Sequence, residues 1–521
     1  MDGDSLPVSA FVENADGQWE TGASAYEKRG TAVSVPTWDA SKCVQCNQCS
    51  FVCSHATIRP FILDDEEVAN APENIRLADA KHKAGMKYVM QVSPLDCMGC
   101  GECITVCPTG AISMVSRESQ EDQQPVFNYL VENISKKQTA FKDNTVIGSQ
   151  YNQPLLEFSG SCAGCAETSY ARLVTQLFGE QMYISNATGC SSIWGGPAAT
   201  CPYTVNKDSK QGPAWSNSLF EDNAEHGFGM SLGQRVLREQ AIEKVAELVT
   251  ENEGLKPVFD AFLETKEDTK ANADATKALI AEVEKIDSPL AKEVLDKKQY
   301  LAKKSVWIFG GDGWAYDIGF GGLDHVLASG ENVNVMVFDT EMYSNTGGQA
   351  SKASNIGEVC QFAAAGKEMK KKSLAEIAMS YGYVYVAQIA LGANPAQAIK
   401  CISEAEAYDG PSLIIGYAPC ELHGIAKGGM NHCQDEMKKA VKAGYWNLFS
   451  FDPAKKAAGK NPFTLTSKEG DGTYQAFLNN EARYARLVKP FPERAEELFA
   501  KSEEAAKERF EHLQKLVELY K

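Results

Sequence analysis

Eight cysteines fall into two runs with the same internal spacing. Both runs have the pattern Cys-x2-Cys-x2-Cys-x3-Cys, and they consist of Cys43, Cys46, Cys49 and Cys53, and of Cys97, Cys100, Cys103 and Cys107. In such a run the first three thiolates wrap one face of an iron–sulfur cube and the fourth ligates the other cluster. The spacing therefore predicts two 4Fe–4S clusters, with Cys107 completing the first set and Cys53 the second. Two zinc sites are the alternative, which the crowding of four thiols into each run disfavours.

A second candidate site follows two apolar runs later in the chain. Gly311-Asp312-Gly313-Trp314 comes after the run 306–309, and Thr340 follows the run 333–338. Residues after neighbouring parallel strands meet at the edge of the sheet where α/β proteins bind ligands. The Asp312 carboxylate, the Thr340 hydroxyl and the Met342 carbonyl would there hold a hard cation such as Mg²⁺ against a diphosphate. Glycines 311 and 313 would let backbone amides approach the phosphate oxygens. This layout predicts a thiamine diphosphate site.

Asn345 lies just beyond the predicted cation ligands. Its side-chain amide is placed to reach a substrate, and the alternative is a turn asparagine before Gly347 and Gly348.

Further thiols suggest a third cluster in the same domain. Cys162 and Cys165 form a Cys-x2-Cys pair, and Cys190 follows a glycine at position 189. Cys420, after the apolar run 413–417, is the preferred fourth ligand, and Cys433 is its rival. Glu167 lies two residues beyond Cys165, within reach of the same site. The cysteines without partners at ligand spacing are expected to be core thiols, namely Cys201, Cys360 and Cys401.

The composition places the chain among soluble globular proteins of several domains. It has 521 residues, 44% of them hydrophobic and 23% charged, with a net charge of −18 and 16 cysteines. The negative charge argues against nucleic acid as a partner. No apolar run approaches the roughly 18 residues that span a bilayer, and the N-terminus has no export signal. Thiols at metal-binding spacing favour a reducing cytoplasm that is poor in oxygen.

The distribution of apolar, polar and charged residues along the sequence divides the chain into three regions. Residues 1–35 are predicted to be a linker, 36–150 a two-cluster domain with a polar, helix-poor end at 116–150, and 151–521 an α/β domain. The Ala-, Glu- and Lys-rich stretch at about 235–304 predicts an insertion of two or three amphipathic helices. Apolar residues at helical spacing predict a final helix over about 491–520. The expected fold is an α+β ferredoxin-like domain followed by an α/β domain with a mainly parallel sheet.

Three motifs together resemble pyruvate:ferredoxin oxidoreductases over essentially the whole chain. They are Cys-Val-Gln-Cys-Asn-Gln-Cys at 43–49, Gly-Asp-Gly-Trp-Ala-Tyr-Asp-Ile-Gly at 311–319 and Tyr-Ser-Asn-Thr-Gly-Gly-Gln at 343–349. The resemblance implies that Cys162, Cys165, Cys190 and Cys420 ligate a cluster close to the thiamine. It also implies that Asn345 contacts pyruvate and that magnesium is held by Asp312, Thr340 and Met342. The residues implied to contact thiamine diphosphate are Glu167, Cys190, Gly311, Asp312, Gly313, Trp314, Thr340, Glu341, Met342, Tyr343, Ser344 and Asn345.

The same resemblance implies an activity, but the chain differs from the family in its length. The reaction is the oxidative decarboxylation of pyruvate with coenzyme A, with electrons passing through three 4Fe–4S clusters to ferredoxin or flavodoxin. Single-chain members of the family are about twice as long, and form dimers, so this chain is expected to be a C-terminal half or a split-gene subunit. Two alternatives are an electron-transfer and cofactor-binding subunit that is inactive without a separate N-terminal half, and an oxidoreductase for another 2-oxoacid.

Overall fold

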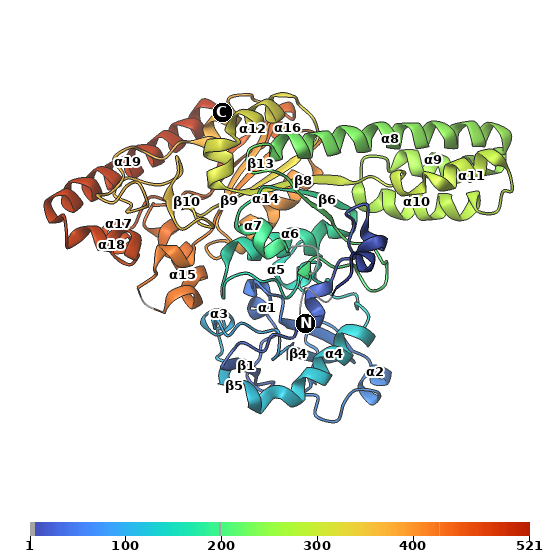
Figure 1. Ribbon diagram of the computed structural model, residues 1–521, viewed down its shortest axis with the longest axis horizontal. Coiled ribbons are helices and arrows are strands. Elements are labelled where there is room, and N and C mark those ends of the chain that lie inside the picture. The colour runs from blue at the N-terminus through green and yellow to red at the C-terminus, as the bar shows by residue number, and fades with distance from the viewer. Residues whose placement is uncertain (1–5, 197–199, 427) are drawn as a thin grey trace.

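The computed structural model of the protein describes residues 6–196, 200–426 and 428–521, so the first five residues of the predicted linker lie outside it. Figure 1 shows a small cysteine-rich region at the bottom of the view, a large α/β region above it, and a helical arm that projects to the right. Each of the three has its own hydrophobic core. In the described ranges, no helix is long and apolar enough to cross a membrane.

The cysteine-rich region is built on an antiparallel pair of strands. β1 (Ser34–Trp38) pairs with β5 (Ile112–Ser116), which brings the two ends of the region together. Each cysteine run continues into a short helix, α1 (Gln48–Val52) or α3 (Glu102–Thr105). The segment between the runs forms a three-stranded antiparallel sheet and one capped helix, with the elements β2 (Ile58–Leu63), α2 (Asp65–Ala69), β3 (Ala78–Asp79) and β4 (Lys87–Val92).

The end of this region contains more helix than its polar sequence predicted. It has η4 (Arg117–Gln123), α4 (Gln124–Asn133) and α5 (Val146–Ser149). α4 forms because Pro125 sits in its first turn and its apolar side chains recur on one buried face, at Val126, Phe127 and Leu130. The expectation of a helix-poor 116–150 was therefore wrong for α4.

The α/β region is organised around an eight-stranded sheet. The strand order is β15-β14-β12-β13-β9-β8-β6-β7, in which the six strands from β12 to β7 pair in parallel and β14 and β15 in antiparallel. The strands are β6 (Met182–Asn186), β7 (Ala214–Asn217), β8 (Ser305–Gly311), β9 (Asn334–Asp339), β12 (Tyr385–Ile389), β13 (Ser412–Tyr417), β14 (Phe449–Phe451) and β15 (Phe463–Leu465). The mainly parallel sheet is thus confirmed, and the apolar runs at 306–309, 333–338 and 413–417 are β8, β9 and β13.

Helices surround this sheet and close the chain. They are α6 (Ala166–Phe178), α7 (Cys190–Gly195), α12 (Phe320–Ala328), α13 (Leu374–Met379), α14 (Pro395–Ala407), α15 (Cys433–Lys442), α16 (Pro453–Ala457), α17 (Tyr474–Asn479), α18 (Ala482–Val488) and α19 (Pro492–Leu519). The final helix α19 matches the expected 491–520 and packs against α18 and β15.

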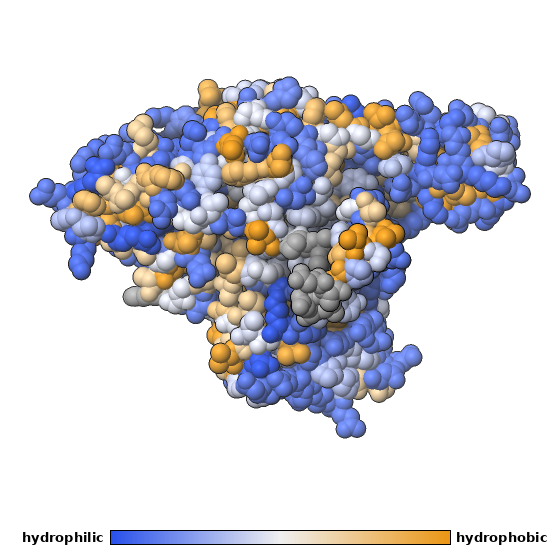
Figure 2. Space-filling view, viewed as in Figure 1, coloured by the Kyte–Doolittle hydropathy of each residue, from blue (hydrophilic) through white to orange (hydrophobic). Residues whose placement is uncertain are grey.

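The helical arm begins earlier and has more helices than the sequence predicted. It consists of α8 (Asn223–Glu251), α9 (Lys256–Glu264), α10 (Thr269–Val283) and α11 (Pro289–Asp296). The first turns of α8 pack on β6 and β8, so that α8 starts inside the α/β region and runs out of it as one continuous helix. Figure 2 shows a largely hydrophilic outer surface on the arm, because its apolar side chains are turned into its own core.

Candidate functional site

The thiamine motif folds as two neighbouring parallel strands. Gly311 of β8 lies opposite Phe338 of β9, so Asp312 and Thr340 leave the same edge of the sheet. The Oγ1 of Thr340 lies 2.9 Å from Oδ1 of Asp312 and 3.0 Å from the carbonyl oxygen of Met342. All three residues are buried. The three oxygens that the sequence proposed as cation ligands therefore form one group, and a carboxylate, a hydroxyl and a carbonyl are ligands that suit Mg²⁺.

The carboxyl group of Asp312 is held from both sides. The backbone N–H of Thr340 donates to Oδ1 at 3.1 Å, and the hydroxyl of Ser351 donates to Oδ2 at 2.5 Å. Burial and the neighbouring Asp339 raise the pKa of Asp312 well above its usual range. A cation bound here would favour the ionised carboxylate, because an opposite charge offsets the cost of burial.

The turn after Asp312 is a single π-helical turn, Gly313–Ile318. Such turns recur at functional sites. At position 313 a Cβ atom would lie 2.6 Å from the ring of Tyr343, so the glycine is required by close packing rather than by a left-handed backbone. Gly311 is more open, because a Cβ there would meet only the carbonyl oxygen of Phe338 at 3.9 Å. The two glycines thus leave the edge of β8 with little side-chain bulk.

Glu341 turns its side chain away from the cation ligands. It is fully buried at a left-handed backbone position (φ +63°). Its carboxylate lies 3.0 Å from the Nζ of Lys371 and 2.8 Å from a guanidinium nitrogen of Arg483, and it accepts a hydrogen bond of 2.5 Å from Tyr445. Although burial raises its pKa, Lys371 and Arg483 hold the pKa of Glu341 at about 2. Only the backbone of Glu341 is therefore left to approach a cofactor.

The remaining residues of the motif differ in how deeply they are buried. Trp314 is fully buried, and its indole N–H has no partner among the described residues. Tyr343 and Ser344 are half-buried, and Ser344 donates to the hydroxyl of Thr340 at 2.7 Å. Asn345 is exposed, with its side chain available to a molecule in solvent.

The first predicted set of thiols lines a common space. Cys43, Cys46, Cys49 and Cys107 border one small cavity together with Met90 and Ile112. Burial raises the pKa of the Cys49 thiol well above its usual value, and the thiolates of Cys46, Cys43 and Cys107 add to this shift. Cys107, the last cysteine of the second run, thus lies with the first three of the first run. This arrangement fits a four-iron cluster, which keeps its thiolate ligands deprotonated.

The second predicted set is grouped in the same way around the start of α3. Burial raises the pKa of Cys103 well above its usual value, with contributions from Cys100, then from Cys49 of the first set, and then from Cys53 and Cys97. The backbone N–H of Thr57 donates to the sulfur of Cys53 at 3.3 Å and orients this fourth thiol. Across the described residues, no three His, Cys, Asp or Glu side chains are spaced as ligands of a single metal ion.

The third predicted set lies beside the thiamine motif. Burial, followed by the charges of Glu167, Cys165, Cys420 and Cys162, raises the pKa of Cys190 well above its usual value. Burial raises the pKa of Cys420 to about 11, while the Leu422 backbone and the Ser344 hydroxyl act to lower it. The ring Nε2 of His423, three residues after Cys420, lies 2.7 Å from the carbonyl oxygen of Thr340, so the Cys420 loop lies next to the proposed cation ligands.

Glu167 lies close to this third set at the start of α6. It is almost fully buried, and burial raises its pKa to about 7, while a hydrogen bond of 2.9 Å from the indole N–H of Trp194 counteracts the shift. The sequence offered no reason to expect Trp194 here, since it lies 27 residues further along the chain.

Cys433, the rival ligand, lies between two sets of thiols. Its pKa is raised well above the usual value by burial, then by Glu102 and Cys165, which belong to loops of the second and third sets. Its thiol faces the carbonyl oxygen of Pro419 at 3.9 Å. Two residues just before Cys433 lie between the same loops: Met430 packs on Gly164, and Asn431 packs on Gly101. The unpaired cysteines are all buried, namely Cys201, Cys360 and Cys401.

Buried polar contacts join the cysteine-rich and α/β regions. Arg59 pairs with Glu157, and the ring Nε2 of His55 lies 3.1 Å from the carbonyl oxygen of Ser161. Arg172 donates to the carbonyl oxygen of Phe51 at 2.5 Å. These residues could not be found from sequence, because each pair is about one hundred residues or more apart and belongs to no motif.

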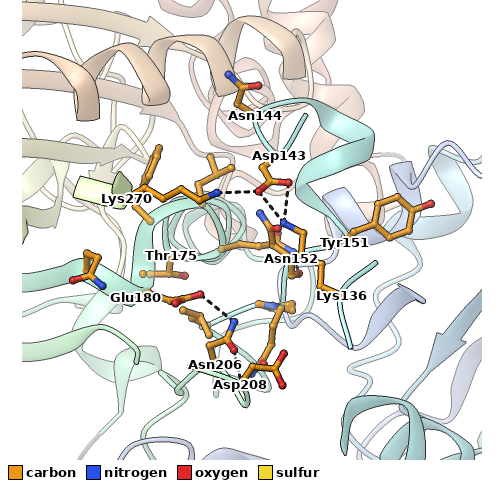
Figure 3. Close-up of a pocket in the computed structure, with 18 of the residues that line it drawn as sticks. Lys136, Asp143, Asn144, Tyr151, Asn152, Thr175, Glu180, Asn206, Asp208 and Lys270 are labelled. Atoms are coloured by element: carbon orange, nitrogen blue, oxygen red, sulfur yellow. Dashed lines mark hydrogen bonds and ion pairs between the residues drawn. The ribbon is translucent and has the colours of Figure 1, made fainter. Parts of the chain in front are cut away.

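A large cavity lies at the junction of the three regions, away from the thiamine motif. It has a volume of about 820 Å³. Figure 3 shows its polar lining, in which Lys136 and Lys270 both reach Asp143, and Asn206 donates to Glu180. The cations drawn there are thus already paired with carboxylates of the chain.

Glu406 lines the same cavity, and its raised pKa predicts that the stability of the protein depends on pH. Burial raises its pKa from 4.5 to about 7, although the indole N–H of Trp307 donates to it at 2.9 Å. A carboxyl whose pKa is raised on folding stabilises the protein fully below its unfolded pKa, and this stabilisation is lost as the pH rises through the folded value. We therefore expect Glu406→Gln to raise the thermal midpoint at pH 8 by about 2–4 °C and to change it little at pH 5.

Circular dichroism melts at a fixed scan rate measure this difference. Glu511→Gln, at an exposed position of α19, is the matched control and should leave both midpoints unchanged. Equal effects of Glu406→Gln at the two pH values would contradict the raised pKa.

Three protein families match separate parts of the chain. Residues 42–111 match the "4Fe-4S dicluster domain", and residues 295–415 match "Thiamine pyrophosphate enzyme, C-terminal TPP binding domain". Residues 1–32 match a family named EKR, described as a "Domain of unknown function". The first match covers the two cysteine runs and the second covers Asp312, Thr340 and Met342, so the chain has a ferredoxin-like iron–sulfur region and a thiamine diphosphate-binding region. The third set of thiols lies outside both matches.

Several proteins are similar to almost the whole chain. The pyruvate:ferredoxin oxidoreductase of Moorella thermoacetica is 52% identical over 99% of this chain and 45% of its own length. The pyruvate-flavodoxin oxidoreductase of Klebsiella pneumoniae is 49% identical over 99% of this chain and 44% of its length. The mitochondrial pyruvate dehydrogenase [NADP(+)] of Euglena gracilis is 46% identical over 99% of this chain and 29% of its length.

The chain thus spans less than half the length of these relatives. A solved structure of a 2-oxoglutarate:ferredoxin oxidoreductase from Magnetococcus marinus matches with 15% identity over 50% of this chain and 64% of that one, at a TM-score of 0.29. About one residue in two is identical to the Moorella and Klebsiella enzymes over 99% of this sequence, so the chain is similar throughout to one part of pyruvate:ferredoxin and pyruvate-flavodoxin oxidoreductases.

Proposed function

We propose that this chain supplies the thiamine diphosphate site and the iron–sulfur clusters of an enzyme that oxidatively decarboxylates pyruvate with coenzyme A to acetyl-CoA and CO2. The observation that carries the proposal is the adjacency of the two sites. The ring Nε2 of His423, three residues after Cys420, lies 2.7 Å from the carbonyl oxygen of Thr340, a proposed cation ligand. A redox cluster built beside a thiamine site is what an enzyme needs when electrons must leave the cofactor singly.

The proposal assigns twelve cysteines to three 4Fe–4S clusters. The sets are Cys43, Cys46, Cys49 and Cys107, then Cys97, Cys100, Cys103 and Cys53, and finally Cys162, Cys165, Cys190 and Cys420. The cavity that the first set shares supports the first grouping, and the thiol charges that raise the pKa values of Cys49 and Cys190 support the first and third groupings. The division into a linker at 1–35, a two-cluster domain at 36–150 and a thiamine domain at 151–521 belongs to the same proposal.

The residues of the chain have distinct roles around the cofactor. Bound thiamine diphosphate would supply the electron sink for decarboxylation. Asp312, Thr340 and the Met342 carbonyl would hold Mg²⁺ against its diphosphate, while the small edge formed by Gly311 and Gly313 leaves room for the phosphate oxygens. Trp314 and Glu167 are buried polar side chains that we propose to contact the cofactor, and the exposed Asn345 would orient pyruvate.

The similarity to these relatives supports the remaining partners. The names of the relatives specify pyruvate, with ferredoxin or flavodoxin as electron acceptor. We propose the same partners for this chain, together with coenzyme A, a cytoplasmic location in anaerobic metabolism, and assembly as a homodimer of the full enzyme. Since the chain spans 45% of the Moorella enzyme, we also propose that the segment corresponding to the rest of that enzyme, in cis or in trans, is required for turnover.

Anaerobic reduction of a viologen dye tests this function. The chain with reconstituted clusters is assayed with pyruvate, coenzyme A, thiamine diphosphate and Mg²⁺, first alone and then with the remaining part of the Moorella enzyme added as a separate polypeptide. We expect reduction only after the addition, and only with both pyruvate and coenzyme A. Turnover by the chain alone would contradict the need for the second part, and a fully loaded pair that is inactive on pyruvate but active on 2-oxobutyrate would contradict the substrate.

A further inference from the structure

The segment matched by the family of unknown function has almost no core of its own. In the described part of it, residues 6–32, the two helices are short 3-10 turns, η2 (Val8–Asn14) and η3 (Ala23–Tyr26). Most of its apolar side chains are exposed, including Val8, Val12 and Tyr26. The segment therefore owes its conformation to the surfaces that it touches rather than to internal packing.

One end of this segment is attached to the α/β region. The backbone N–H of Gly22 donates to the carbonyl oxygen of Tyr203 at 2.6 Å, and the hydroxyl of Ser24 donates to the carbonyl oxygen of Glu157 at 2.9 Å. At Gly22 the backbone is left-handed (φ +84°) and a Cβ would lie 2.9 Å from the hydroxyl of Thr204. This close approach requires a glycine.

The other end is attached to the loop that precedes the second cysteine run. The Nζ of Lys28 lies 2.6 Å from Oδ2 of Asp96, whose side chain is only 2% exposed. The backbone N–H of Gly30 donates to the carbonyl oxygen of Leu95 at 2.8 Å. A buried carboxylate is costly without a cationic partner, so Lys28 stabilises Asp96 in the position directly before Cys97.

The three residues Glu27-Lys28-Arg29 touch both regions within a single turn. Arg29 donates to the carbonyl oxygen of Ser159 at 3.1 Å and also pairs with Glu27. The Nζ of Lys28, besides its contact with Asp96, lies 4.9 Å from the centre of the Phe158 ring. Ser159 and Phe158 belong to the loop that leads into Cys162. Lys28 itself has a positive φ of 44°, a conformation that a non-glycine residue keeps only when its surroundings hold it there.

We infer that the Glu27-Lys28-Arg29 turn holds the loop carrying Cys97 against the loop carrying Cys162; we call this turn the fastener. It thereby sets the separation of the second and third cysteine sets, and so of the clusters that the proposed function places there. Lys28 and Arg29 are positioning residues in this arrangement, because neither is a ligand and each acts through the loop next to a ligand. The role of the family of unknown function would accordingly be to hold two cluster-bearing regions in register.

Hydrogen–deuterium exchange on Lys28→Met, Arg29→Met and the double variant measures the fastening directly. We expect amides in 94–98 and 158–161 to exchange at least about tenfold faster in the double variant, because both attachments of the turn are lost. Lys28→Arg combined with Arg29→Lys keeps both cations and should restore slow exchange. Lys87→Met is the matched control, since Lys87 pairs with Asp79 on the surface of the cysteine-rich region and contacts no other region.

Electron paramagnetic resonance of the dithionite-reduced protein tests the consequence for the clusters. We expect the double variant to keep the wild-type iron content but to lose part of the spin–spin broadening between clusters, and the conservative pair to recover it. Unchanged exchange and unchanged broadening in a fully loaded double variant would overturn the fastener. A wild-type protein with fewer than three clusters would instead overturn the proposed cluster assignment, while the exchange experiment would still decide the fastener.

Discussion

Replacing Arg483 by methionine should destabilise the α/β region more than any surface substitution in the chain. The guanidinium is buried among three carboxylates, with nitrogen–oxygen distances of 2.8 Å to Glu341, 3.2 Å to Glu358 and 2.6 Å to Glu481. Removing one partner of a buried ion cluster leaves uncompensated charge in a medium that solvates it poorly, at a cost of about 3–5 kcal/mol. Glu481 and Glu358 depend on Arg483 most, since against the effect of burial it is the main influence that lowers the pKa of each. Glu341, in contrast, also faces Lys371.

The expected result is a fall of about 5–10 °C in the thermal midpoint of the α/β region at pH 7. Near-ultraviolet circular dichroism at a fixed scan rate follows this transition. Arg486→Met is the matched control, because Arg486 is on the same helix α18, is exposed and donates to the carbonyl oxygen of Ala482 rather than to a buried carboxylate. A midpoint for Arg483→Met within 2 °C of the control would show that the buried carboxylates do not depend on the guanidinium.

Replacing Asp312 by asparagine should abolish tight binding of thiamine diphosphate. Asparagine keeps the size of the side chain but removes the only charged member of the proposed ligand group, which otherwise consists of the Thr340 hydroxyl and the Met342 carbonyl. A hard cation depends on carboxylate oxygens for most of its binding energy. The expected loss of affinity is at least about 100-fold, on the scale of 3 kcal/mol that the loss of a charged partner typically costs.

Isothermal titration of the chain with thiamine diphosphate measures this loss, at saturating Mg²⁺ and again with Mg²⁺ omitted. The variant should lose the dependence on Mg²⁺ that the wild type shows. Asp324→Asn serves as control, since Asp324 lies on α12 of the same region and accepts a hydrogen bond from Tyr381 instead. If Asp312→Asn bound the Mg²⁺ complex as well as the control, the proposed ligand group would be wrong.

Much of the fold was predictable because buried strands and helices have characteristic patterns of apolar residues in the sequence. β8, β9 and β13 are covered on both faces, so they read as short continuous apolar runs. α19 has one apolar face and reads at helical spacing. The helix α4 was missed because it is short, buries only four side chains and lies within a polar segment. The start of α8 was missed because its first turns pack on the sheet without a distinct pattern.

In the candidate site, too, the residues within short sequence motifs were predictable, and their partners from distant parts of the chain were not. The cysteine spacing and the two glycine-rich turns are local, and they singled out the groups that the structure brings together around Asp312 and Cys107. The partners that orient them are distant. Arg483 meets Glu341 from a helix near the end of the chain, Trp194 meets Glu167 from another helix, and Lys28 meets Asp96 from a segment that reads as a linker. Such pairs are determined by tertiary packing alone.

The wedge formed by Met430 and Asn431 has a consequence for how the protein is made. These residues pack on Gly164 and Gly101, which belong to the loops of the third and second cysteine sets. During synthesis the ribosome reaches them roughly 15–50 s after Cys165, at the usual rate of about 5–20 residues per second. Throughout that interval both loops stand uncovered in the nascent chain. Iron and sulfide therefore reach the second cysteine set more easily before residues 430 and 431 are translated. The third set also needs Cys420, which precedes Met430 by only ten residues, so its cluster is completed close to the time at which its loop is covered.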